Sequence, residues 1–235
     1  MTALNKSELS FTSTNDHDYI EALLKNSEVE VDKRKVVLCI PKDAGVVIGS
    51  TQKMTHELER YAKAHSSEIH RRSSGGSAVV IDPINSIWLD IFLPPNDPLA
   101  KKSIEETFEV ASVGWKAILE SGGVDAETYR GAYLQDPQYR EICFAGRAHG
   151  EILVKGKKVV GMAQRRRRIG TYIHTMTYVD FPYSSTMEAA YGVDISREDR
   201  ERLNVGSLSD FGDFHVDHAE TYLEIFTAAL NGFFG

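Results

Sequence analysis

The sequence lacks several features that would each place it in a specialised class of protein. Its 235 residues include two cysteines, Cys39 and Cys143, which lie far apart. A disulfide framework or a zinc-finger site needs more cysteines at closer spacing, so we expect reduced thiols and no metal site. No apolar run is long enough to span a bilayer, and the N-terminus has no apolar core typical of a signal peptide. We therefore expect a cytoplasmic protein with no membrane partner.

An excess of positive charge is also missing. Lys and Arg total 27 against 34 Asp and Glu, which gives a net charge of -7. Proteins that bind nucleic acid through bulk attraction are usually basic, so we expect no nucleic-acid partner. Positive charge is nevertheless concentrated in residues 151–170, EILVKGKKVVGMAQRRRRIG, where four arginines follow a lysine-rich turn. A binding site for a negatively charged partner must therefore lie in such a local cluster of basic residues.

The apolar content is high enough for a sizeable core. Hydrophobic residues make up 42% of the chain, and no repeat or low-complexity linker divides it. We therefore expect one domain over residues 1–235. The hydrophobic pattern predicts helices over 17–26, 54–65, 97–120 and 217–230, strands over 34–40, 44–50, 77–83 and 86–94, and a run of antiparallel strands over 141–181. This order favours an α+β fold.

Residues 71–80, RRSSGGSAVV, form the first stretch that can carry chemistry. The Gly-Gly pair would let a ligand approach the backbone closely, and Arg71 or Arg72 would supply positive charge to an anion. The alternative is an ordinary glycine-rich turn before a strand. Taken alone, the stretch favours that alternative, because it matches neither a Walker loop nor a dinucleotide-binding fingerprint.

The lysine-rich hairpin forms the second stretch. VKGKKVVGMAQ predicts a strand, a turn at 155–157 and a second strand that begins at Lys158. Gly161 and Ala163 leave space over one face of that strand, so Lys158 can lie in a pocket and hold a carboxylate or phosphate. For Lys155 and Lys157 we expect solvated side chains.

Three ordered motifs resemble one protein family. VVIGSTQ (46–52), RRSSGGSAVVID (71–82) and VKGKKVVGMAQRR followed by IHTMTYVD have the order and separations seen in the lipoate-protein ligase and octanoyltransferase family. The resemblance covers about Arg34 to Pro182. It implies the fold of the biotin and lipoate ligases, a mixed, mostly antiparallel sheet backed by helices.

The resemblance also implies a reaction and its partners. Members of the family attach lipoate or octanoate to a lysine of a lipoyl carrier domain or of the glycine-cleavage carrier protein. Ligases first make an acyl-adenylate from ATP and Mg²⁺, whereas octanoyltransferases take the acyl group from octanoyl carrier protein. The sequence ends at Gly235, before the accessory domain of many ligases, so a ligase would need a separate accessory subunit.

Carried over residue by residue, the resemblance assigns a site. Lys158 matches the family's essential lysine, which holds the acyl carbonyl and stabilises the oxygen as negative charge develops. The resemblance and the hairpin together assign substrate binding to Gln52, Arg72, Ser74, Gly75, Gly76, Ser77, Asp82, Gly161, Ala163 and His174. For His174, which shares a strand face with apolar residues, a satisfied core histidine is the alternative.

Two departures from the family pattern affect the expected pocket. The usual GGGAVxHD reads GGSAVVID here, so that Ser77 replaces the third glycine and Ile81 replaces the histidine, while Asp82 is kept. Ser77 is expected to narrow the approach to the ligand, and Ile81 removes a hydrogen-bonding group. A non-catalytic acyl-binding protein is therefore a further alternative, which the retention of Lys158 argues against.

Cys143 bears on the choice between the two reactions. In one branch of octanoyltransferases a nucleophilic cysteine lies in a CF step about fifteen residues before the essential lysine, as Cys143 does here. A thiolate near Lys158 would form an acyl thioester. The alternative is a buried structural cysteine in a strand. Because the following AGRAHGE looks more like the adenylate-forming ligases, the sequence favours the ATP-dependent ligase over the octanoyltransferase.

The arginine run has two interpretations. Arg165, Arg166, Arg167 and Arg168 form a solvated hairpin end or a basic rim that attracts an acidic partner. Carrier domains in this family are typically acidic around the modified lysine. The resemblance therefore implies that the four arginines bind the carrier, at a position within a few strand residues of the reacting carbonyl.

Overall fold

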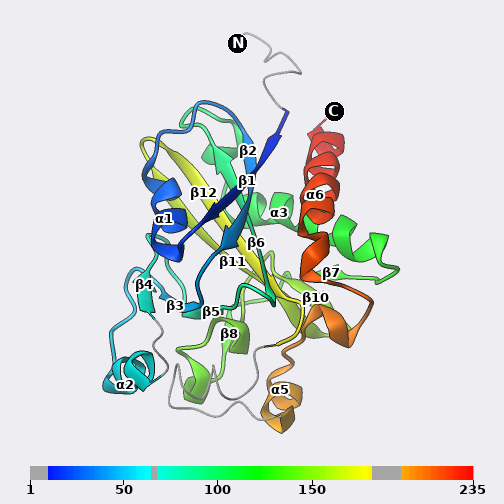
Figure 1. Cartoon of the computed structure of the whole chain (residues 1–235). Helices are drawn as coiled ribbons and strands as arrows, with labels where there is room; N and C mark the ends of the chain where they lie inside the picture. The colour runs from blue at the N-terminus through cyan, green and yellow to red at the C-terminus, as the bar shows by residue number, and fades with distance from the viewer. Residues whose placement is uncertain (1–9, 65–67, 182–196, 235) are drawn as a thin grey trace.

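Two packed sheets form the centre of the protein (Figure 1). The computed structural model describes residues 10–64, 68–181 and 197–234. The larger sheet has the order β1-β2-β6-β12-β11-β10-β7, and its pairs are antiparallel except for β1 with β2. Its strands are β1 (Thr12–Asp18), β2 (Lys35–Pro41), β6 (Ser86–Leu93), β7 (Glu127–Thr128), β10 (Ile152–Val154), β11 (Lys157–Arg167) and β12 (Gly170–Tyr178). The sheet is mixed and mostly antiparallel, which confirms the expected fold class.

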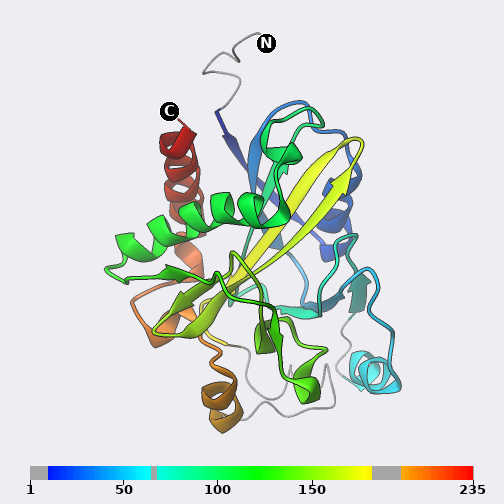
Figure 2. The ribbon, with the colours of Figure 1, turned by 180° about the vertical axis from the view of Figure 1, so that it is seen from behind.

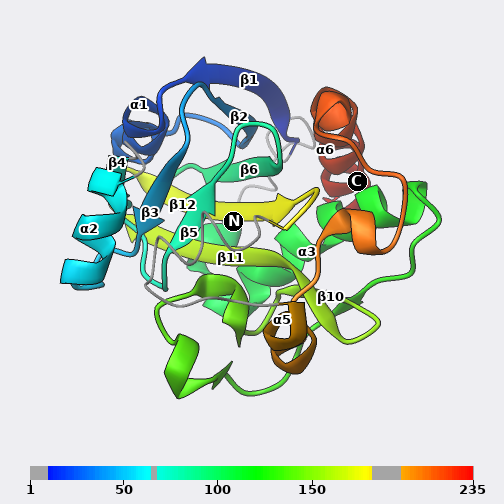
Figure 3. The same cartoon turned by 60° about the horizontal axis from the view of Figure 1, so that its bottom comes forward.

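A smaller sheet of order β4-β3-β5 lies against one face of the larger sheet (Figure 3). Its strands are β3 (Gly45–Ile48), β4 (Glu68–Arg71) and β5 (Val79–Ile81), and a further pair joins β8 (Leu134–Gln135) to β9 (Gly146–Arg147). The α-helices are α1 (Ile20–Lys25), α2 (His56–Ala64), α3 (Ile104–Ser121), α5 (Arg197–Leu203) and α6 (Ala219–Phe234). The short 3-10 helices are η2 (Asn26–Glu28), η3 (Leu99–Lys101), η4 (Pro137–Tyr139), η5 (Cys143–Ala145), η6 (Leu208–Asp210) and η7 (Val216–His218). Together α3 and α6 cover the opposite face of the larger sheet, as Figure 2 shows from behind.

Strand β6 shows why the core has two halves. All eight of its residues are buried, and alternate side chains point to opposite faces. Leu89 and Ile91 join the core under α3 and α6, whereas Trp88 and Phe92 join the core under the smaller sheet. Asp90 lies on the same face as Trp88 and is the one charged residue of the strand. The core between the sheets therefore contains a buried carboxylate.

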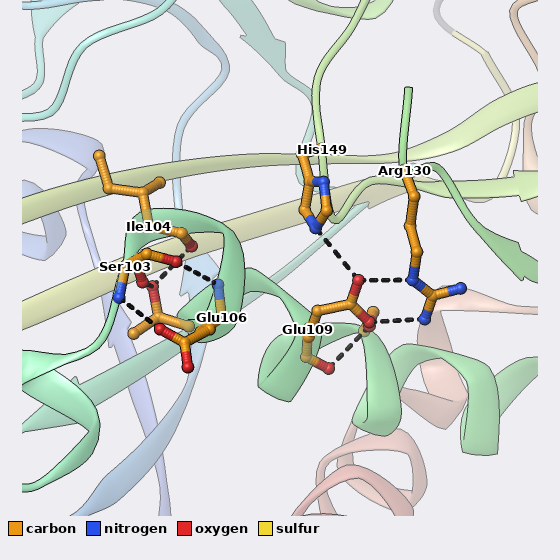
Figure 4. A network of polar contacts seen from close by, with 8 residues as sticks. Ser103, Ile104, Glu106, Glu109, Arg130 and His149 are labelled. Carbon is orange, nitrogen blue, oxygen red and sulfur yellow. Dashed lines mark hydrogen bonds and ion pairs between the residues drawn. The ribbon is translucent and has the colours of Figure 1, made fainter. Parts of the chain in front are cut away.

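Several element boundaries differ from those that the sequence predicts. The helix expected over 17–26 is shorter, and β1 precedes it as a polar strand that pairs in parallel with β2. The helix expected to start at 97 starts at Ile104, because Ser103 and Glu106 form a capping box there (Figure 4). The sequence analysis did not predict strand β4 or helix α5. Cys143 lies in η5 and not in a strand.

Candidate active site

An apolar pocket lies between the two sheets. Its wall comes from α1, the strands β3, β5, β6, β11 and β12, and η5. The lining residues are Leu24, Val47, Arg72, Val79, Ile81, Trp88, Cys143, Phe144, Gly161, Met162, Ala163, His174, Thr175 and Met176. Of the residues expected to bind substrate, the pocket therefore brings together Arg72, Gly161, Ala163 and His174, with Cys143 beside them. Such a lining suits an aliphatic chain.

Lys158 lies beside this pocket and is buried. Its side chain is 1% exposed, and its ammonium nitrogen Nζ lies 2.7 Å from Oε1 of Glu151, whose side chain is 3% exposed. Nζ also donates to the carbonyl oxygens of Cys143, at 2.8 Å, and Gly146, at 2.9 Å. The Cys143 Sγ atom is 3.9 Å from Nζ. An ammonium has three N–H donors, so these three oxygen acceptors satisfy Lys158 completely.

The charge of Lys158 is retained in this environment. Burial alone would lower its pKa, but the electrostatic interactions with Cys143 and with Glu151 outweigh burial and raise the pKa above its ordinary value. Burial also raises the pKa of Glu151. Lys158 therefore lies in a buried position, as expected from the small residues beside it, and the carboxylate that it holds is one of the protein's own, Glu151. The turn before it is as predicted, because Lys155 and Gly156 both have positive φ, as a tight hairpin turn requires.

The Cys143 segment is held from two directions. Its backbone N–H donates to the Ala78 carbonyl at 3.0 Å, and Lys158 holds its carbonyl from the other side. The thiol is partly exposed and lines the pocket. A Cβ built on Gly161 would lie 3.4 Å from Sγ, so the absence of a side chain at Gly161 leaves the thiol room.

The glycine-rich loop supports this segment. Arg72 is buried and donates to the carbonyls of Val47, Gly75 and Ser77. Ser77 Oγ donates in turn to the carbonyl of Arg140 at 2.7 Å. Arg72 thus fixes the loop, and Ser77 fixes the residues that precede Cys143. Arg72 also lines the pocket, so its predicted role in binding an anion stays a prediction.

The remaining loop residues lie around the pocket wall. Gln52 is in the turn after β3, and its amide donates to the carboxylate of Glu141 at 2.8 Å and to the Glu141 carbonyl at 3.2 Å. A Cβ on Gly49 would lie 1.8 Å from the Gly76 carbonyl oxygen, so Gly49 accepts no side chain without movement. Gly76 has φ +91°, and a Cβ there would lie 2.9 Å from the Arg72 guanidinium. Arg71 donates to three carbonyls of the β3–α2 turn, at Gly49, Ser50 and Gln52. These residues therefore shape the loop and do not line the pocket.

Two further expected residues are not on the pocket wall. Ser74 is fully buried, its carbonyl accepts from Ser50, and its Oγ has no hydrogen-bond partner among the described residues. Asp82 closes a turn by accepting from the Ile84 N–H and the Asn85 amide. Asp82 is thus a turn residue outside the pocket lining, and its contact with the substrate stays a prediction.

Glu151 is a site residue that the sequence did not reveal. Its Oε2 accepts from the Ala148 N–H at 2.7 Å, and its backbone lies in the segment that enters β10. Figure 4 shows how that segment is attached to α3: Glu109 accepts from Arg130 at 2.8 and 2.7 Å and contacts His149 Nε2 at 3.1 Å. The available signal was a glutamate directly before a buried apolar strand, where an unpaired charge would be costly.

His174 is one of the polar residues of the pocket wall. Its Nδ1 lies 2.7 Å from Oδ2 of Asp90, and the other oxygen of Asp90 accepts from Trp88 Nε1 at 2.6 Å. All three residues are buried. The second ring nitrogen, Nε2, is buried without a hydrogen-bond partner among the described residues. His174 is therefore neither an ordinary satisfied core histidine nor bonded to Cys143.

The arginine run lies at the other end of β11. Arg165 is seven positions after Lys158, which corresponds to roughly 23 Å along the strand. Arg165 is half-buried and donates to the Ser73 carbonyl, whereas Arg166, Arg167 and Arg168 are exposed. The run is thus distant from Lys158 and only two residues beyond Ala163 of the pocket wall, and its role in carrier binding stays a prediction.

No metal-binding cluster is found in the described part of the chain. No three His, Cys, Asp or Glu side chains there are arranged to hold an ion, and the pocket wall includes no carboxylate. The residues present do not form a Mg²⁺ site on their own, so we derive no step through this ion. The described helices also include none that is long and apolar enough to cross a membrane.

Comparisons with known proteins agree on one superfamily. A family model described as "Lipoyl protein ligase A/B catalytic domain" matches residues 16–229. "Octanoyltransferase LipM" of Clostridioides difficile is 29% identical over 136 residues, which is 57% of this chain and 49% of that protein. The match thus spans about half the length of this curated relative.

Solved structures share the fold. A putative lipoate protein ligase from T. acidophilum with bound lipoic acid aligns with a TM-score of 0.67 at 20% identity, over 95% of this chain and 85% of that one. A second structure, of a bi-partite archaeal lipoate protein ligase and its E2 lipoyl domain from Thermoplasma acidophilum, aligns with a TM-score of 0.61 at 18% identity, over 95% and 84% of the two chains. At these identities the likeness concerns the fold.

Proposed function

The chain belongs to the lipoyl protein ligase A/B catalytic domain family, and from this premise we propose that it is an octanoyltransferase that forms an acyl thioester on Cys143. The observation that carries the proposal is the position of the Cys143 thiol, which lines the apolar pocket 3.9 Å from the Lys158 ammonium. The curated relative named an octanoyltransferase supports the same reaction. The proposal differs from the sequence analysis, which favoured an ATP-dependent ligase over an octanoyltransferase.

The first step loads the enzyme. The octanoyl chain lies in the pocket, and the Cys143 thiolate attacks the carbonyl carbon of an octanoyl thioester of a carrier protein. A bond forms between Sγ and the carbonyl carbon as the donor's carbon–sulfur bond breaks, and the donor leaves as a thiol with the proton of Cys143. No oxidant, ATP or metal ion enters this exchange.

Lys158 acts on the first step through its charge. The Lys158 ammonium lies 3.9 Å from Sγ, where its positive charge faces the reacting sulfur. Its three donors already bind protein oxygens, so Lys158 places Cys143 and sets the local electrostatic field. It can donate to the developing oxyanion only by giving up one of these three bonds.

The second step transfers the acyl group to the carrier. The amine of the carrier lysine attacks the thioester carbonyl, an amide bond forms, and Sγ leaves and recovers its proton from the amine. A lipoyl domain is the partner named for one structural neighbour. We propose the same class of partner here, an acidic lipoyl carrier domain or the glycine-cleavage carrier protein, with octanoyl carrier protein as donor.

Mass spectrometry of the protein and of a lipoyl domain tests the proposal. Incubation with octanoyl carrier protein is expected to add one octanoyl group to wild-type Cys143 and then to the domain, whereas Cys143→Ala gives neither product. Lipoate with ATP and Mg²⁺ forms the parallel incubation. Modification of the domain only in that second incubation, with no loss in Cys143→Ala, would identify an ATP-dependent ligase and refute the thioester route.

A further inference from the structure

Tyr133 is an exposed aromatic residue that hydrogen bonds connect to Lys158. It directly precedes β8 and is 66% exposed. Its hydroxyl donates to Oε1 of Gln135 at 2.8 Å, and Gln135 in β8 lies opposite Gly146 in β9. The Gly146 carbonyl accepts from Lys158 Nζ at 2.9 Å. An exposed phenol is therefore held at the rim of the site, two residues from the Lys158 ammonium.

The support under the phenol is itself fixed. The amide nitrogen of Gln135 donates to the carbonyl of Tyr139, a residue that is 3% exposed, at 3.0 Å. This bond leaves Oε1 as the amide atom that faces Tyr133. A Cβ on Gly146 would lie 2.0 Å from Oε1, so the amide rests directly on the glycine backbone. The position of the Tyr133 hydroxyl therefore follows from β8 and β9.

The phenol offers a ligand an acceptor atom and an apolar ring. Burial raises the pKa of Tyr133, and Cys143 acts in the same direction, whereas Lys158 opposes them. The hydroxyl is therefore protonated at neutral pH, and its proton is used in the bond to Gln135. The oxygen lone pairs can accept from an N–H group. A thioester carbonyl has no such donor, but the amine at the end of a lysine stem has both the donor and the apolar chain.

We propose that Tyr133 binds the acceptor lysine of the lipoyl domain, with its ring against the methylene stem and its oxygen accepting one amine N–H. The inference rests on the proposed function, because the lysine must attack an acyl group on Cys143. A neutral amine has two N–H groups and one lone pair, so a bond through one N–H leaves the lone pair for the thioester carbonyl carbon. The bonds formed and broken in the transfer step are unchanged, and Tyr133 orients the nucleophile.

Measurement of the two steps one at a time tests the proposal. The protein is acylated with octanoyl pantetheine, freed of the excess and mixed with the lipoyl domain, and mass spectrometry follows both steps. Tyr133→Phe keeps the ring and removes the oxygen, which should slow transfer about fivefold. Tyr133→Ala also removes the ring and should slow transfer by roughly thirtyfold. Acylation of Cys143 by octanoyl pantetheine should keep its wild-type rate in both variants.

Tyr19 provides the matched control. It is an exposed tyrosine too, at 60%, and its ring faces Lys42 before α1. Tyr19→Phe and Tyr19→Ala should leave both rates unchanged. Equal transfer rates in the wild type and Tyr133→Ala would overturn the proposal. It would also be wrong if Tyr133→Phe slowed acylation and transfer by the same factor, because the phenol would then act on Lys158 through Gln135.

Binding without reaction separates this inference from the proposed function. The Kd of the lipoyl domain is measured by fluorescence anisotropy with Cys143→Ala, with and without Tyr133→Ala. A second lipoyl domain has methionine in place of its acceptor lysine. If no thioester forms on Cys143 but Tyr133→Ala weakens binding of the lysine domain alone, the thioester route is wrong and the role of Tyr133 stands. If Cys143 is acylated and all Tyr133 variants transfer at one rate, the role of Tyr133 is wrong and the thioester route stands.

Discussion

Removal of either partner of the Lys158–Glu151 pair should destabilise the protein strongly. Both side chains are almost completely buried, at 1% and 3% exposure, and their charged atoms are 2.7 Å apart. Loss of one partner leaves an uncompensated buried charge, which costs about 3–5 kcal/mol. For a domain of this size that loss lowers Tm by roughly 6–20 °C.

The double variant separates charge burial from packing. Replacement of both residues, Lys158→Met with Glu151→Met, removes both charges at once, and such replacements of buried pairs often cost little. The free energy of unfolding of the wild type, both single variants and the double variant is measured by urea denaturation. The expected coupling energy is about 3 kcal/mol, with the double variant closer to the wild type than either single variant.

Lys157 provides the matched control for this cycle. It is the neighbouring lysine of the same strand, and its ion pair with Glu201 at 2.6 Å is partly exposed. Lys157→Met should therefore cost less than about 1 kcal/mol. A wild-type free energy of unfolding in Lys158→Met would refute the reasoning, because it would mean that Glu151 is neutral or solvated in the folded protein.

The remaining predictions concern the pair in alkali, the pocket, the loop and the arginine run. The folded pKa of Lys158 is raised above 10.5, so its contribution to stability is complete below pH 10.5 and is lost as pH rises through the folded pKa. The variant with methionine at both 151 and 158 should not show this loss in alkali. If both proteins unfold in parallel as pH rises, the reasoning is wrong. Gly161→Val places bulk beside the Cys143 thiol and should lower kcat/KM for octanoyl and acetyl thioesters alike, by about tenfold. An unchanged kcat/KM for both chains would mean that the thiol does not react from this position. Ser77→Ala removes the hydrogen bond to the Arg140 carbonyl, which should lower the free energy of unfolding by about 1 kcal/mol and slow the acylation of Cys143. An unchanged acylation rate would mean that the loop does not position Cys143. Replacement of Arg167 and Arg168 by glutamate should lower the rate of acyl transfer to an acidic carrier by roughly tenfold at low salt and by less at high salt. Acylation of Cys143 by a small thioester should not change. Loss of that acylation would place the arginines in the acyl site.

Features set by neighbouring residues were predictable from the sequence. The hairpin around Gly156 was predicted because a positive-φ turn between β-branched strands is a local signal. The polar strand β1 was missed because its side chains carry no hydrophobic alternation, and only its pairing with β2 makes it a strand. The hydrogen-bond partners of Lys158 were missed for a similar reason, since its acceptors at Cys143, Gly146 and Glu151 come from residues that the fold alone brings to it.

The two departures from the family pattern have different consequences in the folded protein. Ser77 was expected to narrow the approach to the ligand, but its hydroxyl donates to Arg140 and so joins the glycine-rich loop to the segment that carries Cys143. Ile81 does line the pocket and removes a polar group from β5. The wall keeps polar groups on its other side, because His174 lines it from β12 and is held in place by Asp90 of β6. The loss of a polar group from β5 therefore leaves the pocket with a more apolar smaller-sheet side and a polar larger-sheet side.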